Sequence, residues 1–298
     1  MGWRVVSIEN PAHLSLEQGS LVIKRDQIAK LPIEDIDVLV IDNYAVTMSA
    51  NLLGELATNN VATIICDSHH TPRSITEPLS QHSRQAKVSQ MQVNMSQPLR
   101  KNLWQIIVKQ KIVNQAAVLS KFGHDETAGK LIKLVTEVRS GDTTNRESIA
   151  ARLYFAELFD DATRRRPTWY NSALNYTYAI MRSVVARSVA ARGFVPSLGL
   201  FHHNELNSFN LADDLIEPYR AFADDYVLST IAVRHVGDTM DANLGKDDRH
   251  LAIDILNNYV IIKNKRFTVR DAIGITAESL VQAISENSPT KLELPRFK

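Results

Sequence analysis

One stretch of the chain combines an imidazole, two carboxylates and a guanidinium at spacings that suit metal-dependent chemistry. His202 is followed by Asp214 and Glu217, and these two acids are three residues apart, so they share one face of a helix. Arg220 follows Glu217 at the same spacing. A hard divalent cation prefers oxygen ligands with at most an occasional imidazole, and it keeps waters that a substrate phosphate can replace. His202 and Glu217 supply such an open site, but a third ligand is missing locally.

The best candidate for the third ligand is Glu147. It stands in the first turn of a helix expected at about residues 145–160, which has a small-residue face and an aromatic face. The helix dipole favours a carboxylate at this position even without a metal. A purely structural role for Glu147 is therefore about as well supported as metal ligation.

The elements that must position these residues divide the chain into two parts. Residues 1–66 contain short β-branched runs between turn signals, which predict a small β domain with an inserted helix. Gln18-Gly19 lies between two alternating apolar runs and predicts a hairpin. Helical periodicity then takes over. The fold class is therefore predicted to be α+β.

The domain boundaries follow from the same change of pattern. We expect an N-terminal β domain over 1–72, a linker with a first helix over 73–95, and a larger α-helical domain over 96–298. Further helices are expected at about 98–123, 126–139, 145–160, 170–192 and 270–286, with a small hairpin near 260–269.

Charge is unevenly distributed, although the net charge of the 298 residues is only +1. Residues 1–72 contain four Lys or Arg and nine Asp or Glu, whereas residues 73–121 contain eight and one. The basic segment is typical of a phosphate-facing surface, but a solvated helix face explains it about as well. The densest basic run, Arg164-Arg165-Arg166, is open to the same two interpretations.

The single cysteine, Cys66, follows an apolar run and is expected to be a small buried hydrophobe. One cysteine allows no internal disulfide, which suits a reducing cytoplasm. The chain has neither a long apolar run nor a charged and then apolar leader, so we expect a cytoplasmic protein with no membrane partner.

Four motifs follow one another between residues 147 and 220. They are Glu147 with Ala151, Tyr154 and Phe155; Asn171-Ser172-Ala173-Leu174-Asn175-Tyr176-Thr177-Tyr178; Gly193-Phe194 with Pro196, Leu198, Gly199 and His202; and Asp214-Leu215 with Glu217, Pro218 and Arg220. Together they resemble the CRISPR-associated integrase, the catalytic subunit of the spacer-acquisition machinery. The detail around His202-His203-Asn204 is most similar to the branch associated with type II CRISPR systems. One departure is Thr168-Trp169-Tyr170, where many relatives have an aspartate.

This resemblance implies a β-sandwich-like N-terminal domain that dimerises and an α-helical catalytic domain. It also implies that Glu147, His202 and Glu217 are the catalytic residues and hold Mg²⁺ or Mn²⁺. Asp214 matches a position that is acidic in many members and is expected to assist. Arg220 is expected to hold the Glu217 carboxylate rather than to bind substrate.

His203 is assigned an auxiliary role or a DNA contact, because neighbouring side chains do not point the same way in regular structure. An exchange of roles between His202 and His203 stays open. Arg84 and Lys87 in the basic segment, together with Arg164, Arg165 and Arg166, are expected to bind the DNA backbone with little sequence preference.

The partners implied are double-stranded DNA, as prespacer and as CRISPR repeat, and a second copy of the chain. Two homodimers would be bridged by a small ferredoxin-like companion subunit in a heterohexamer, and type II systems add further acquisition factors. The implied reaction is attack of a DNA 3′-hydroxyl on a phosphodiester at the repeat boundary. Two alternatives are a nucleic-acid-binding scaffold with a structural acidic cluster and a general metal-dependent nuclease on branched DNA.

Overall fold

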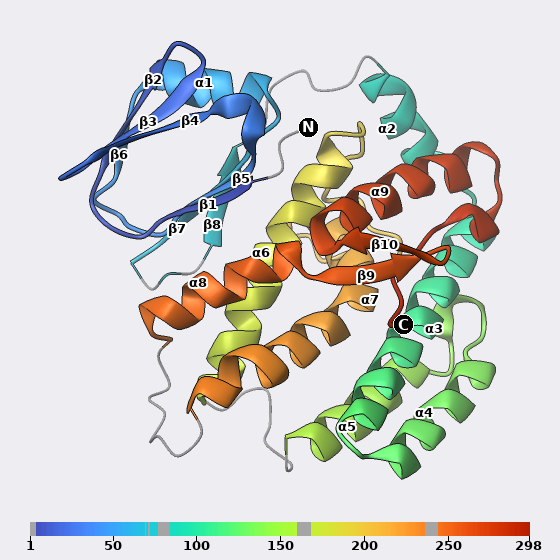
Figure 1. The fold of residues 1–298 in the computed structure, drawn as a ribbon. Helices are drawn as coiled ribbons and strands as arrows, with labels where there is room; N and C mark the ends of the chain where they lie inside the picture. The colour runs from blue at the N-terminus through green and yellow to red at the C-terminus, as the bar shows by residue number, and fades with distance from the viewer. Residues whose placement is uncertain (1–3, 69, 71, 77–83, 160–167, 236–243) are drawn as a thin grey trace. The chain divides into compact units, whose positions relative to one another are not determined.

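The computed structural model describes residues 4–68, 70, 72–76, 84–159, 168–235 and 244–298. It divides into two compact units, Met1–Gln85 and Ala86–Lys298 (Figure 1). The first unit extends beyond the expected boundary at residue 72, because a strand at Pro72–Thr76 pairs with Ala62–Cys66. The expectation that this stretch is already linker was wrong.

Two four-stranded sheets form the first unit, with orders β1-β5-β7-β8 and β4-β3-β2-β6. The strands are β1 (Arg4–Ile8), β2 (His13–Glu17), β3 (Ser20–Lys24), β4 (Ile28–Pro32), β5 (Ile36–Ile41), β6 (Thr47–Met48), β7 (Ala62–Cys66) and β8 (Pro72–Thr76). Strand β5 is parallel to both β1 and β7, whereas β8 is antiparallel to β7. The short turn η1 (Ile33–Asp35) links the two sheets.

The core of this unit lies between its sheets and the helix α1 (Ala50–Thr58). Leu14 and Leu21 from one sheet, Leu39 from the other, and Leu52 from α1 belong to one buried cluster. A core shared by two sheets confirms the β-sandwich-like expectation. Cys66 is buried, as its apolar context predicted.

Local chemistry explains where these elements begin and turn. The hairpin between β2 and β3 turns at Gln18 and Gly19, which both have positive φ, as a two-residue hairpin turn requires. Ser49 caps α1 by accepting a hydrogen bond from the backbone N–H of Leu52.

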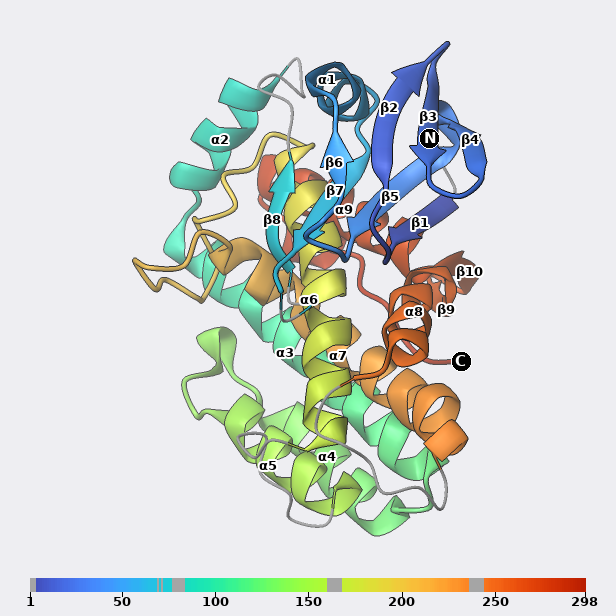
Figure 2. The ribbon, with the colours of Figure 1, turned by 90° about the vertical axis from the view of Figure 1, so that its left-hand side faces the viewer.

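Helices dominate the second unit (Figure 2). They are α2 (Gln85–Val93), α3 (Gln97–Lys121), α4 (Asp125–Glu137), α5 (Arg146–Leu158), α6 (Trp169–Ala190), α7 (Asn210–Tyr226), α8 (Lys246–Asp254) and α9 (Val269–Ser285). Short helical turns are η2 (Ser140–Asp142), η3 (Val227–Ile231), η4 (Ala232–His235), η5 (Ile255–Asn257) and η6 (Pro289–Lys291). The expected hairpin is present as β9 (Tyr259–Ile262) and β10 (Lys265–Thr268).

Helix α3 is the organising element of the second unit, because α4, α5 and α7 all pack against it (Figure 2). Pro98 lies in its first turn, and Gly123, with φ 86°, follows its last residue. Helix α6 packs against α7 and α9. None of the helices in the described ranges is both long enough and apolar enough to span a bilayer.

Candidate active site

Two of the predicted acids project from different helices of the second unit. Glu147 lies in the first turn of α5, as expected. The carboxylate of Asp142 accepts the backbone N–H groups of Arg146 at 2.9 Å and Glu147 at 3.0 Å, which fixes the start of this helix. Glu217 lies in the middle of α7 and is only 5 % exposed.

The ammonium group of Lys111, on α3, joins these two acids. Its Nζ lies 2.6 Å from Oε1 of Glu147 and 2.5 Å from Oε2 of Glu217. Helix α3 packs against both α5 and α7, so this lysine is held between the two carboxylates. Burial alone would lower the pKa of Lys111, but the charges of Glu217 and Glu147 outweigh it and raise the pKa.

Arg220 completes the charge balance around Glu217. Its Nε donates to Oε1 of Glu217 at 2.8 Å, and its guanidinium lies over the ring of Tyr178. Burial would raise the pKa of Glu217, but the charges of Arg220 and Lys111 lower it to about 2. The expected role of Arg220 as a partner of this carboxylate agrees with the geometry.

Asp214 is fully buried and organises the loop that carries His202. Its carboxylate accepts the backbone N–H groups of Leu200, Phe201 and His202 at 2.5, 3.1 and 3.1 Å. The Nδ1 atom of His202 lies 2.8 Å from Oδ1 of the same carboxylate. Because a carboxylate only accepts, Nδ1 of His202 is the donor, and the lone pair of Nε2 is left for a ligand.

Neighbouring acids change the pKa of the His202 imidazole. The hydrogen bond to Asp214 raises the pKa of His202 against the opposing effect of burial, and the charge of Glu217 adds to the increase. The edge of the ring packs on Trp104 of α3, with ring centroids 5.8 Å apart. His203 contacts the backbone carbonyl of Phe201 through Nδ1 and is exposed. Of the two histidines, His202 is therefore the one coupled to the acidic residues.

The loop between α6 and α7 is held by two buried amides. Gln92 of α2 is 4 % exposed; it donates to the carbonyls of Val195 and Leu198 and accepts the N–H of Val195. Asn210 donates to the carbonyls of Ser197, Asn204 and Asn207. The loop conformation is thus fixed before any ligand binds.

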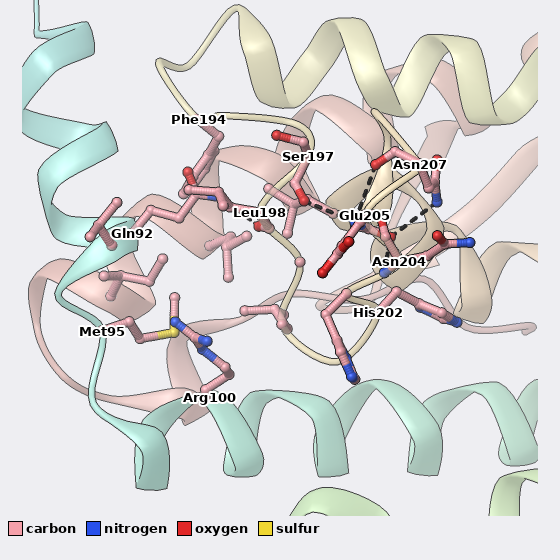
Figure 3. Close-up of a pocket in the computed structure, with 18 residues that line it drawn as sticks. Gln92, Met95, Arg100, Phe194, Ser197, Leu198, His202, Asn204, Glu205 and Asn207 are labelled. Carbon is pink, nitrogen blue, oxygen red and sulfur yellow. Dashed lines mark hydrogen bonds between the residues drawn. The ribbon is translucent and has the colours of Figure 1, made fainter.

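A cavity of about 530 Å³ opens beside this loop (Figure 3). Its lining includes Met95, Arg100, Phe194, Leu198, His202 and His203. The Nε atom of Arg100 is buried and makes no hydrogen bond. The cavity therefore offers apolar walls and a guanidinium next to the candidate catalytic imidazole.

The remaining sequence-predicted residues are not part of this cluster. Lys87 is exposed on α2, and Arg84 is exposed in the turn before it. Arg164, Arg165 and Arg166 lie outside the described residues. Tyr176 and Tyr178 are buried in α6.

A preassembled three-ligand site is not present in the described part of the chain, where no group of three His, Cys, Asp or Glu side chains is placed to hold a metal. The donor set nevertheless fits a hard divalent cation. Glu147 and Glu217 already share one cationic group, the ammonium of Lys111, and its partner atom on Glu217, Oε2, is buried. His202 presents an imidazole that Asp214 orients, and the charge of Glu217 acts on it.

Lys111, Gln92 and Asn210 were missed by the sequence reasoning. Lys111 had a readable signal, because it stands four residues after Ile107 and three after Val108, on the buried face of α3. A charge on such a face needs a partner of opposite charge. The two amides had no comparable signal, since their partners are backbone groups, which for Gln92 lie more than 100 residues further along the chain.

The fold and the site together define a class: a two-unit α+β protein with an acidic, histidine-containing cluster in its helical unit. The family model "CRISPR associated protein Cas1" matches residues 5–246. The chain belongs to the Cas1 family, which confirms the resemblance inferred from its motifs.

A curated relative shows how closely the chain follows this family. The CRISPR-associated endonuclease Cas1 of Neisseria meningitidis serogroup C (strain 8013) is 41 % identical over 299 residues, covering 100 % of this chain and 97 % of the relative.

Two solved structures share the fold. A casposase bound to integration product aligns with a TM-score of 0.77 at 16 % identity, over 97 % of this chain and 92 % of the casposase. A Cas6-RT-Cas1–Cas2 complex aligns with a TM-score of 0.75 at 21 % identity, over 98 % of this chain. This chain spans only 36 % of the longer chain in that complex.

Proposed function

We propose that this chain is a metal-dependent DNA integrase and endonuclease that inserts prespacer DNA into a CRISPR array. The observation that carries the proposal is the meeting of Glu147 and Glu217, from separate helices, at one cationic group beside an oriented His202. The name of the Neisseria relative, an endonuclease, and the casposase bound to its integration product support DNA strand chemistry.

The proposed reaction is a transesterification without a covalent enzyme intermediate. A DNA 3′-hydroxyl loses its proton and attacks a phosphodiester at the repeat boundary, a new P–O bond forms as the existing P–O3′ bond breaks, and the released 3′-oxygen takes up a proton. Bound Mg²⁺ or Mn²⁺ would make the hydroxyl easier to deprotonate and offset charge on the phosphate oxygens. Glu147, Glu217 and Nε2 of His202 would hold the cation. Asp214 keeps the imidazole in the required tautomer, and Arg220 keeps Glu217 ionised although it is buried.

The proposed partners follow from the same family. The Cas6-RT-Cas1–Cas2 complex supports Cas2 as the small ferredoxin-like companion subunit. Two homodimers of this chain, dimerised through the N-terminal β unit, would be bridged by that companion, with further acquisition factors of type II systems. Arg84, Lys87 and Arg164–Arg166 would bind the DNA backbone by charge.

The first test replaces Glu217 with glutamine. E217Q keeps the size of the side chain and an acceptor for Arg220 but removes the charge that would hold a metal. Purified protein, its companion subunit, a prespacer duplex and a repeat-bearing plasmid are incubated with Mn²⁺ or Mg²⁺, and the product ends are sequenced. We expect strand joining to fall by at least about 100-fold, because a lost ligand removes several kcal/mol of transition-state stabilisation.

The matched control is E126Q, because Glu126 is an exposed acid of α4 that pairs with Lys130. E126Q should join strands like the wild type. Full joining by folded E217Q would defeat the assignment. A non-catalytic scaffold would instead bind DNA equally well with a chelator present and give no joined product with any variant.

Hydrolysis at the same site is the second candidate activity, favoured by the endonuclease name of the curated relatives. Water would then take the place of the 3′-hydroxyl. A general nuclease would cut branched DNA in preference to joining ends, so the ratio of cut to joined product on one substrate separates the two activities.

A further inference from the structure

Lys111 occupies the place where a shared ligand of Glu147 and Glu217 would have to sit. Only 8 % of this lysine is exposed, and its ammonium contacts an oxygen of each glutamate at 2.6 and 2.5 Å. Lysine is rarely buried to this extent unless it is paired. Two acids and two cations, Lys111 and Arg220, therefore balance one another without a metal.

A divalent cation held by both glutamates cannot share this space with the ammonium group. Mg²⁺ binds carboxylate oxygens at about 2.0–2.1 Å, closer than the lysine nitrogen stands to either acid. Two like charges at such a separation repel strongly in a buried site. The lysine has a flexible four-carbon stem that can swing its charge away, whereas Arg220 holds the other oxygen of Glu217.

We propose that Lys111 is a tethered counter-ion that closes the acidic site in the metal-free protein and is displaced when a divalent cation binds. The inference rests on the proposed function, because it concerns the metal site of that function. It predicts that the ammonium of Lys111 and the metal ion compete for the carboxylate oxygens of Glu147 and Glu217. The lysine stabilises the resting protein and weakens metal affinity at the same time.

The contacts of Lys111 use the oxygens that a shared metal ion would need. Nζ of Lys111 donates to Oε1 of Glu147. The same ammonium is in charge contact with the buried Oε2 of Glu217, whereas Oε1 of Glu217 accepts from Arg220. The ammonium therefore occupies one oxygen of each carboxylate, and a metal ion can bind both of these oxygens only when the ammonium leaves.

The direct test replaces the charge and keeps the stem. Mn²⁺ affinity is measured by electron paramagnetic resonance on folded wild type, K111M and the control K121M. Lys121 is on the same helix and pairs with Asp225 at the surface. K111M should bind Mn²⁺ at least about tenfold more tightly than the wild type, because it has lost the competing charge. K121M should match the wild type, and E217Q should lose the binding.

A second measurement uses the wild-type protein and does not depend on the folding of K111M. Lysines are acetylated with an amine-reactive ester at increasing Mn²⁺ concentrations, and the labelled peptides are quantified by mass spectrometry. Labelling of Lys111 should rise along the same curve as Mn²⁺ binding, because displacement exposes the amine. Labelling of Lys121 should stay constant.

The outcomes separate this inference from the function on which it rests. Wild type that binds Mn²⁺ without a gain in Lys111 labelling overturns the displacement, and so does folded K111M with no increase in affinity. If folded wild type and K111M both fail to bind Mn²⁺, the proposed metal site itself is wrong, and the inference falls with it.

Discussion

At the scale of single residues, the site depends on two acidic side chains that are buried on one helix. Glu217 and Asp214 are three residues apart on α7 and nearly equally buried, yet they do different work. Glu217 is paired with the side-chain cations of Lys111 and Arg220, so its carboxylate can bind a metal ion in place of one of them. Asp214 accepts hydrogen bonds from three backbone N–H groups and one imidazole, so its carboxylate holds the loop in place.

This division of labour predicts the behaviour of D214N. Asparagine cannot accept the His202 hydrogen bond as a charged partner, so the raised pKa of His202 should fall in metal-free protein. Strand joining should fall by about 10- to 100-fold, the usual effect of losing a residue that orients a ligand. An NMR titration of the imidazole and the joining assay measure the two effects.

The pairing of His202 with Asp214 also makes the stability of the folded protein depend on pH. Because the pKa of His202 is raised on folding, its pairing with Asp214 stabilises the protein fully below the unfolded pKa of about 6.5. That stability is lost as the pH rises through the folded pKa, and D214N should lack this dependence. E126Q is the control, since Glu126 is an exposed acid of α4 that pairs with Lys130. An unchanged His202 titration in D214N would contradict the argument.

At the scale of elements, the loop between α6 and α7 is built by close approach rather than by sequence-local structure. A Cβ atom on Gly199 would stand 2.2 Å from the backbone oxygen of His202 and 2.7 Å from Oδ2 of Asp214. Neither atom can move away easily, because the first is backbone and the second accepts the backbone N–H groups of Leu200 and Phe201. Glycine is required here for space.

G199A should therefore displace the His202 loop. We expect a lower melting temperature, a loss of about 1–3 kcal/mol of unfolding free energy, and strand joining reduced at least about tenfold. Gly129 in α4 has nothing within 4 Å of its ideal Cβ position and provides the control. G129A should keep full activity and gain about 0.5–1 kcal/mol of unfolding free energy. Wild-type joining by G199A would show that the close approach does not matter.

Elements also mark the limit of what the sequence can predict. Helices α3, α5 and α9 were predicted within a few residues, because apolar periodicity and caps are local signals. Strand β8 was missed, because its identity comes from pairing with β7. Similarly, Nδ1 of His70 lies 2.9 Å from Oδ1 of Asp42, which stands 28 residues earlier in the chain. Contacts between residues that are far apart along the chain cannot be read from local patterns in a single sequence.

The candidate active site was also only partly predictable from the sequence. The types and order of Glu147, His202 and Glu217 carried the family resemblance, and their neighbourhood could be anticipated from it. The buried position of Lys111 can be read from the apolar periodicity of α3, but its two acidic partners cannot, because they stand on other helices. Only the packing of α3 against α5 and α7 brings the three groups together.

At the scale of the whole molecule, the basic segment over 73–121 is only partly a surface for DNA. Arg73 pairs with Asp67, and Lys121 pairs with Asp225. Lys111 is buried and pairs with Glu147 and Glu217. Lys87 and Lys101 are exposed and have no ion pair within the described ranges. The excess of charge in the sequence therefore overstates the charge available to a phosphate backbone.

The double variant K87A/K101A tests which charges meet DNA. Each phosphate contact releases counter-ions, so removing two of them should lower the slope of log affinity against log salt by about two. Affinity should fall for every duplex sequence alike, because backbone contacts carry no base information. Fluorescence anisotropy over a salt series measures both effects. K130A is the control, since Lys130 is already paired with Glu126 on α4. A salt slope that stays at the wild-type value in K87A/K101A would place the DNA on another face.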